Sequence, residues 1–152
     1  MKAILKSSVI ILLISFSRLS QANELLEIKT VVELAYEQIW SDLNAEAVEV
    51  FHTDDFTLLN DGEDFWSNFD VVLYLNRIKK VQSKTMKKAN SFEFLEHKIY
   101  DDLAWITFYN TRQSSDATSR ISETKWLESA FLVKENNQWK FQLLHSSQVR
   151  NP

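Results

Sequence analysis

Hydrophobic residues recur at helical spacing near the start of the sequence. Between Asn23 and Leu43 the apolar residues stand three or four positions apart, and most of the glutamates fall on the opposite side. This pattern predicts an amphipathic helix of about five turns. Asn44 is a typical N-cap residue, so we expect a short second helix over Ala45–Phe51.

A short apolar run and a third helix follow. Phe56–Leu59 is the apolar run, and the next residues form a turn that contains the only glycine of the chain, Gly62, where a positive φ angle suits glycine. Ser67, with Asp70 three residues later, resembles a capping box. It predicts a helix that ends near Lys79.

After about residue 90 the spacing of apolar residues changes from the helical period to alternation, which is typical of strands. Polar Gln113–Arg120 is expected to be a mobile hairpin loop. Helices followed by a run of antiparallel strands indicate an α+β fold, and the sequence shows no repeat or linker that would divide residues 23–152 into two domains. The predicted strands are Ser91–Tyr100, Leu103–Arg112, Ile121–Lys134 and Gln138–Val149.

Residues 1–22 have the pattern of a secretory signal peptide. Two lysines precede the apolar run Val9–Ile14, and small residues, Ser20 and Ala22, stand three and one positions before the expected cleavage site. The apolar run is too short to span a bilayer. We therefore expect a periplasmic or secreted protein without a stable membrane anchor after cleavage; an uncleaved anchor or an amphipathic first helix is the alternative.

Composition and charge exclude several classes of protein. With no cysteine and one glycine, the chain has no disulfides, no catalytic thiol and no glycine-rich phosphate loop. Residues 1–22 hold three basic and no acidic residues, so the remaining chain carries 14 basic against 21 acidic residues, a net charge of −7. We expect such an acidic domain to bind neither nucleic acid nor anionic membranes.

Several short motifs stand out along residues 24–149. They are Trp40 near the end of the first helix, the acidic step Asp54-Asp55-Phe56, and Asp61-Gly62 in the next turn. The last strand adds Trp139, an apolar residue two positions on, His145 and Ser147. Together these motifs resemble the nuclear transport factor 2-like superfamily, in particular its SnoaL-like members and related exported domains. The resemblance implies a cone-shaped fold, with N-terminal helices packed on a curved antiparallel sheet.

The resemblance also implies a pocket inside the cone. Alternation places Trp139, Phe141, Leu143, His145 and Ser147 on one face of the last strand. If that face lines the cone, His145 is a candidate general acid or base and Ser147 a candidate ligand contact. Trp40 is a further ligand-contact candidate. The alternative is a structural histidine that is hydrogen-bonded to Ser147 or to a backbone carbonyl.

Two other strands offer candidates. On Leu103–Arg112, Trp105 and Tyr109 share a face with two threonines, a combination that suits a pocket for an organic ligand. Apolar residues on the opposite face make a dimer-forming sheet an equal possibility. On Ile121–Lys134, Trp126 and Glu128 share a face, and Trp126 is a further ligand-contact candidate. If that face is buried, Glu128 should be paired or have a raised pKa and is a candidate base; the alternative is an exposed carboxylate at the rim.

Asp55 is the third catalytic candidate, with a solvated turn or cap as its alternative interpretation. The three histidines lack metal-ligand spacing, and the acidic residues after Asn60 do not match a calcium loop, so we expect no metal and no cofactor.

These observations favour an exported domain that binds a small apolar or aromatic organic molecule. A non-catalytic homodimer or protein-interaction module and a cofactor-independent isomerase or hydrolase are the alternatives. A cavity of a few hundred Å³ beside these residues would favour ligand binding; a core filled by aromatic side chains would favour the interaction module.

Overall fold

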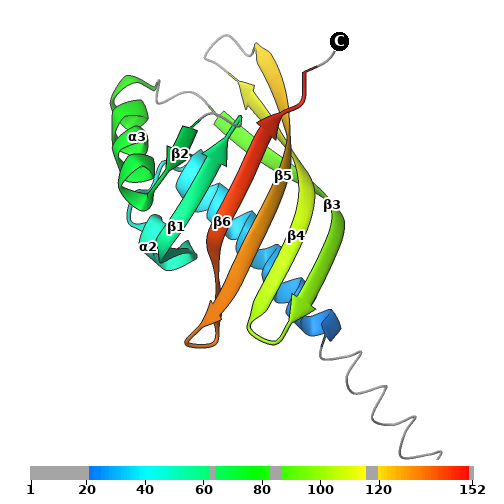
Figure 1. The fold of residues 1–152 in the computed structure, drawn as a ribbon. Coiled ribbons are helices and arrows are strands. Elements are labelled where there is room, and N and C mark those ends of the chain that lie inside the picture. The colour runs from blue at the N-terminus through cyan, green and yellow to red at the C-terminus, as the bar shows by residue number, and fades with distance from the viewer. Residues whose placement is uncertain (1–20, 62–63, 83–86, 116–119, 151–152) are drawn as a thin grey trace, which may run out of the picture.

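The computed structural model describes residues 21–61, 64–82, 87–115 and 120–150 of the 152-residue chain. Within them, helices cover one face of a six-stranded sheet (Figure 1). The α+β class and the packing of N-terminal helices on a sheet are thus confirmed. Most of the predicted signal peptide, Gly62 and residues 116–119 of the predicted loop lie outside the described residues. Gln113–Ser115, predicted to belong to that loop, continue the preceding strand instead.

The first helix confirms the first amphipathic pattern and adds an unexpected feature. Residues 21–35 are α-helical, and the helix continues as a π-helix, η1, over Tyr36–Ser41. Ile28, Val32 and Ile39 are buried against the sheet, as their helical spacing requires. The helix ends where Leu43 takes a left-handed conformation, with φ 54°.

Two shorter helices lie on the side of the sheet that holds β1 (His52–Asn60) (Figure 1). In α2 (Ala47–Phe51) the Asn44 side chain accepts a hydrogen bond from the backbone N–H of Glu46, 3.1 Å away, although the helix itself starts later than predicted. α3 (Asn68–Val81) begins with the predicted capping box of Ser67 and Asp70. Across the described residues no helix is long and apolar enough to cross a membrane.

The sheet has the order β2-β1-β6-β5-β4-β3, in which β1 and β6 pair in parallel and the other neighbours pair antiparallel. Strand β1 is longer than the predicted apolar run, and β2 was not predicted. The strands of the sheet are β1 (His52–Asn60), β2 (Asp64–Trp66), β3 (Lys87–Tyr100), β4 (Leu103–Ser115), β5 (Ile121–Glu135) and β6 (Gln138–Gln148). The inner face, which packs against the first helix, carries the core residues Ala104, Ile106, Phe108, Ala130, Leu132, Phe141 and Leu144.

A bulge in β6 changes which residues face the helix. Leu132 of β5 pairs with Phe141, but the preceding residue, Phe131, pairs with Leu143, so Gln142 is an extra residue in β6. Before the bulge Phe141 points inward; after it, Leu144 and Ser146 do. The strict alternation assumed for this strand is therefore interrupted.

Candidate functional site

A cavity of about 410 Å³ opens between the end of the first helix, α3 and the inner face of the sheet. Its size falls in the range of small-molecule pockets. Four aromatic side chains form much of its wall: Trp40, Trp66, Tyr74 and Trp126. The rings of Trp66 and Tyr74 lie 5.2 Å apart and those of Trp40 and Tyr74 6.4 Å apart, so β2 and α3 extend the aromatic wall that the first helix begins.

Glu128 lies at the inner end of this cavity. Its side chain is buried, with 3% of the residue exposed. One carboxylate oxygen accepts a hydrogen bond from the Tyr36 hydroxyl and the other from Ser146 Oγ, 2.8 Å away. Burial raises the pKa of Glu128 to about 7, although both hydrogen bonds and the charge of Arg112 act in the opposite direction. The interpretation of Glu128 as an exposed carboxylate at the rim is therefore wrong. The alternative, a buried carboxyl group that is hydrogen-bonded and has a raised pKa, is confirmed.

Tyr36 reaches Glu128 because of its place in the first helix. It is the first residue of η1, and Trp40, one turn later, lines the same cavity. Burial, followed by the nearby charge of Glu128, holds the pKa of the Tyr36 hydroxyl well above its usual value. Tyr36 therefore stays a hydrogen-bond donor to the carboxylate. π-Helical turns occur frequently at functional sites.

Strand register orders the polar groups from the inner end of the cavity toward its mouth. Phe108, Glu128 and Ser146 stand opposite one another on β4, β5 and β6. Two residues along, Asn110 pairs with Trp126. The Oδ1 atom of Asn110 is buried in the cavity wall and has no hydrogen-bond partner in the described part of the chain.

Two basic side chains stand nearer the mouth. Arg112 pairs with Asn90 of β3, whose Oδ1 accepts a hydrogen bond from Arg112 Nε at 3.2 Å. The Arg112 guanidinium also lies over the Trp126 ring, 5.5 Å from its centroid. Lys88, two residues from Asn90, lines the cavity as well. Burial and the nearby Arg112 charge lower the pKa of Lys88.

The structure corrects the predicted placement of His145 and Ser147. Because of the β6 bulge, their neighbours Leu144 and Ser146 line the cavity, while His145 and Ser147 stand on the other face. There Ser147 Oγ and His145 Nε2 are 3.1 Å apart, the hydrogen bond that the structural alternative expected. Neither residue is among those that form the cavity.

The face chosen for β4 was also wrong. Ala104, Ile106, Phe108 and Asn110 point into the core, so Trp105 and Tyr109 lie on the outer face of the sheet, away from the cavity. The amino group of Lys125 sits 3.9 Å from the centroid of the Tyr109 ring, an outer-face contact. Trp40 and Trp126 were placed correctly in the cavity wall.

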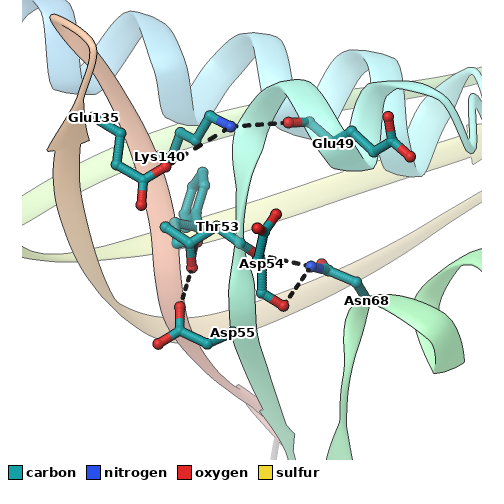
Figure 2. Close-up of polar contacts among 8 residues, drawn as sticks. Glu49, Thr53, Asp54, Asp55, Asn68, Glu135 and Lys140 are labelled. Atoms are coloured by element: carbon teal, nitrogen blue, oxygen red, sulfur yellow. Dashed lines mark hydrogen bonds and ion pairs between the residues drawn. The ribbon is translucent and has the colours of Figure 1, made fainter.

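Asp55 does not reach the cavity either. It is exposed on β1, where it accepts hydrogen bonds from Thr53 Oγ1 at 2.8 Å and from Gln142 Nε2 at 3.2 Å, the latter at the bulge of β6. Figure 2 shows the surrounding contacts: Asn68 Nδ2 donates to the carbonyl of Thr53, and Lys140 Nζ donates to that of Glu49. The first bond ties β1 to α3, and the second ties β6 to α2.

The sequence reasoning missed five cavity residues that carry the polar chemistry: Tyr36, Lys88, Asn110, Arg112 and Ser146. One signal was present. Asn110 and Arg112 continue the strictly apolar face Ala104, Ile106 and Phe108, which is the better candidate for an inward face than one that alternates aromatic residues with threonine. Among the described residues, no group of three or more histidine, aspartate or glutamate side chains is placed to hold a metal ion.

No protein-family model matches the sequence, and no curated protein does. Solved structures do match. A ketosteroid isomerase-like protein from Erwinia carotovora atroseptica shares 18% identity at a TM-score of 0.64, covering 84% of this chain and 98% of that one. A protein from Catenulispora acidiphila shares 14% identity at a TM-score of 0.73, covering 85% and 94%.

The association domain of CaMKII from C. elegans is a third similar structure, with 15% identity and a TM-score of 0.65 over 84% of this chain and 98% of that one. At these identities the likeness concerns the fold alone. The order of helices and strands, the curved sheet and these structural neighbours agree with the resemblance seen in the sequence. The chain therefore has the cone-shaped nuclear transport factor 2-like fold.

Proposed function

We propose that this protein binds a small organic molecule in the cavity that Glu128 closes. The observation that carries the proposal is the combination of an aromatic wall with converging polar groups at one end, including the unpaired Asn110 Oδ1. Ligand pockets are built in this way: apolar surface supplies affinity, and a few polar atoms fix orientation. A buried acceptor without a partner costs free energy that a ligand donor recovers.

Ligand binding can be tested by thermal shift and calorimetry against a library of aromatic and alicyclic compounds. Asn60→Trp places a bulky ring in the cavity wall at the end of β1, whereas Asn76→Trp places the same ring on the exposed side of α3. Hits should lose binding in Asn60→Trp and keep it in Asn76→Trp. Hits that bind both variants equally, or a library without any hit, would contradict the proposal.

Acid–base catalysis is a second candidate function, because a carboxyl group with a pKa of about 7 is suited to accept and return a proton near neutral pH. One of the structural neighbours is described as ketosteroid isomerase-like. For any ligand found above that is chemically changed, Glu128→Gln should abolish turnover and retain binding. Unchanged turnover in Glu128→Gln would remove Glu128 from the catalytic role.

We further propose that two copies of the chain associate through the outer face of the sheet. Leu103 is 57% and Phe131 51% exposed there, and Phe131 pairs in register with Trp105 on β4 and with Leu143 on β6. Such an apolar patch is typical of an interface. Sedimentation should show a dimer that Phe131→Lys converts to monomer, whereas Phe65→Lys, at a residue 73% exposed on β2, should leave it intact.

Export is part of the same proposal and rests on the sequence of residues 1–22 alone. Expressed with its full sequence in a Gram-negative host, the protein should appear in the periplasm with a mass that corresponds to a start at Asn23. A cytoplasmic protein that retains Met1 would contradict export.

A further inference from the structure

Two basic side chains line the mouth of the cavity without an acidic partner. Within the described residues, the ion pairs involve Lys125, Lys134 and Lys140, and neither Arg112 nor Lys88 takes part in one. Among the residues that the structure describes, Arg112 makes one side-chain hydrogen bond, from Nε, which leaves the guanidinium nitrogens at its tip for another acceptor. Unpaired cations in a partly buried site are costly unless an anion joins them.

The position of the Arg112 side chain favours a ligand over a structural role alone. The Nε–H group of Arg112 donates to Asn90 Oδ1, and the guanidinium carbon lies over the Trp126 ring, 5.5 Å from its centroid. Asn90 is held in turn, because its Nδ2 donates to Ser41 Oγ at the end of the first helix, 2.8 Å away. The guanidinium is therefore fixed in orientation, as a site that binds two oxygens of an acidic group requires.

Acidic groups also line the cavity. The charge of Arg112 acts on the pKa of Glu128, but within the described residues neither Glu128 nor Asp61 forms an ion pair with Arg112 or Lys88. Asp61 follows β1, which is four strands from β3 in the sheet order, and its Oδ1 accepts a hydrogen bond from the backbone N–H of Gln148. Glu128 stands four residues deeper than Arg112, counted along β4 by register, and is engaged by Tyr36 and Ser146. The cavity thus has a basic mouth and an inner end of hydrogen-bonding groups.

We propose that the ligand is an organic anion whose acidic group pairs with Arg112 and Lys88 at the mouth, while its apolar body lies between Trp40, Trp66 and Trp126. This inference rests on the proposed ligand-binding function and adds the chemical class of the ligand. A carboxylate or a sulfonate provides the shared chemistry, since each presents at least two oxygens to a guanidinium. Binding would also relieve the repulsion between the two cations.

The test uses two fluorescent probes that differ in one charged group. 1-Anilinonaphthalene-8-sulfonate carries a sulfonate, and N-phenyl-1-naphthylamine is the same ring system without it. Both are titrated into the full protein, Arg112→Gln, Lys88→Gln, Arg112→Lys and Asn60→Trp. The control is Lys98→Gln, which removes an exposed lysine of β3 outside the cavity. Melting temperatures establish that each variant is folded.

We expect Arg112→Gln to lower the affinity for the sulfonate probe about tenfold and the affinity for the uncharged probe less than about twofold. Lys88→Gln should act in the same direction, Arg112→Lys should recover part of the loss, and Lys98→Gln should change neither probe. High salt should weaken only the charged probe.

Four results would overturn the inference. If both probes bind in the cavity but the affinity of neither changes in Arg112→Gln, the ligand-binding proposal is supported and the proposal of an anionic ligand is wrong. If both probes lose affinity equally in Arg112→Gln, Arg112 only supports the Trp126 wall. If neither probe binds the wild-type protein, the titrations contradict the proposed pocket itself. The same holds if both probes bind Asn60→Trp with unchanged affinity.

Discussion

The hydroxyl group of Tyr36, at the start of the π-helical turn, donates a hydrogen bond to Glu128 in the middle of β5. The two residues are 92 positions apart in the chain, and their contact joins the helical layer to the sheet at the inner end of the cavity. Tyr36 also packs edge-on against Phe92 and Phe108, with ring centroids 5.3 and 6.0 Å away. The site is therefore built into the core.

Tyr36→Phe should destabilise the protein without disturbing this packing. The substitution removes only the hydroxyl, so it leaves one oxygen of a buried carboxylate without its donor, at a cost of about 1–3 kcal/mol in the free energy of unfolding. The loss should be larger at pH 8, where Glu128 is mostly ionised, than at pH 5. Urea unfolding at both pH values measures it. Tyr100→Phe, at a residue 66% exposed, is the matched control and should be neutral.

Two buried titratable groups should give opposite pH dependences of stability. The folded-state pKa of Glu128, about 7, lies above its ordinary value of 4.5, so the folded protein holds a proton that the unfolded chain has released. The free energy of unfolding should therefore fall as pH rises from 4.5 to 7, by about 1.4 kcal/mol per pH unit at most, and then level off.

His52 acts in the other direction. Burial lowers its pKa from 6.5 to about 4, so between those values the unfolded chain binds a proton that the folded protein excludes, and stability falls as pH falls. Between about pH 4.5 and 6.5 the two effects oppose each other. The wild-type protein should show little net change in this window.

Single variants separate the two contributions. Glu128→Gln should lose stability steadily on acidification below pH 6.5, whereas His52→Gln should gain stability over the same range, each by about 3 kcal/mol in total. Chemical denaturation at half-unit pH steps provides the test. If the free energy of unfolding of both variants changed with pH in the same way, these two groups would not control the pH dependence of stability below pH 6.5.

The capping box of α3 should matter for stability and for the cavity wall. Ser67 Oγ and the Asp70 carboxylate satisfy backbone N–H groups at the start of this helix, and Tyr74 and Ile78 of the same helix line the cavity. Ser67→Ala should cost about 1 kcal/mol. Asn76→Ala, in the exposed middle of α3, should be neutral or slightly stabilising. Equal melting temperatures for Ser67→Ala and the wild type would contradict the role of the cap.

The sequence predicted the elements well and the faces of the strands poorly. Helical spacing, the Ser67 cap and the alternation after residue 90 locate three helices and four long strands because these signals are local. The bulge at Gln142 follows from the pairing of β6 with its neighbours, and the adjacent Leu143 and Leu144 fit either face. The Tyr36–Glu128 contact depends on the tertiary fold, so no spacing in the sequence predicts it.

The placement of His145 and Ser146 offers the most direct test of this difference. If strict alternation held, His145→Ala would remove a cavity side chain; with the bulge, Ser146 stands in the cavity, where its hydroxyl donates to Glu128 at 2.8 Å, and His145 faces outward. Ser146→Ala should therefore raise the pKa of Glu128 further and weaken the binding of cavity ligands, because one oxygen of the carboxyl group loses its donor. His145→Ala should change neither.

Carbon-detected NMR titration of the Glu128 carboxyl and the probe titrations described above measure the two effects. Loss of binding in His145→Ala with full binding in Ser146→Ala would show that β6 presents the other face to the cavity.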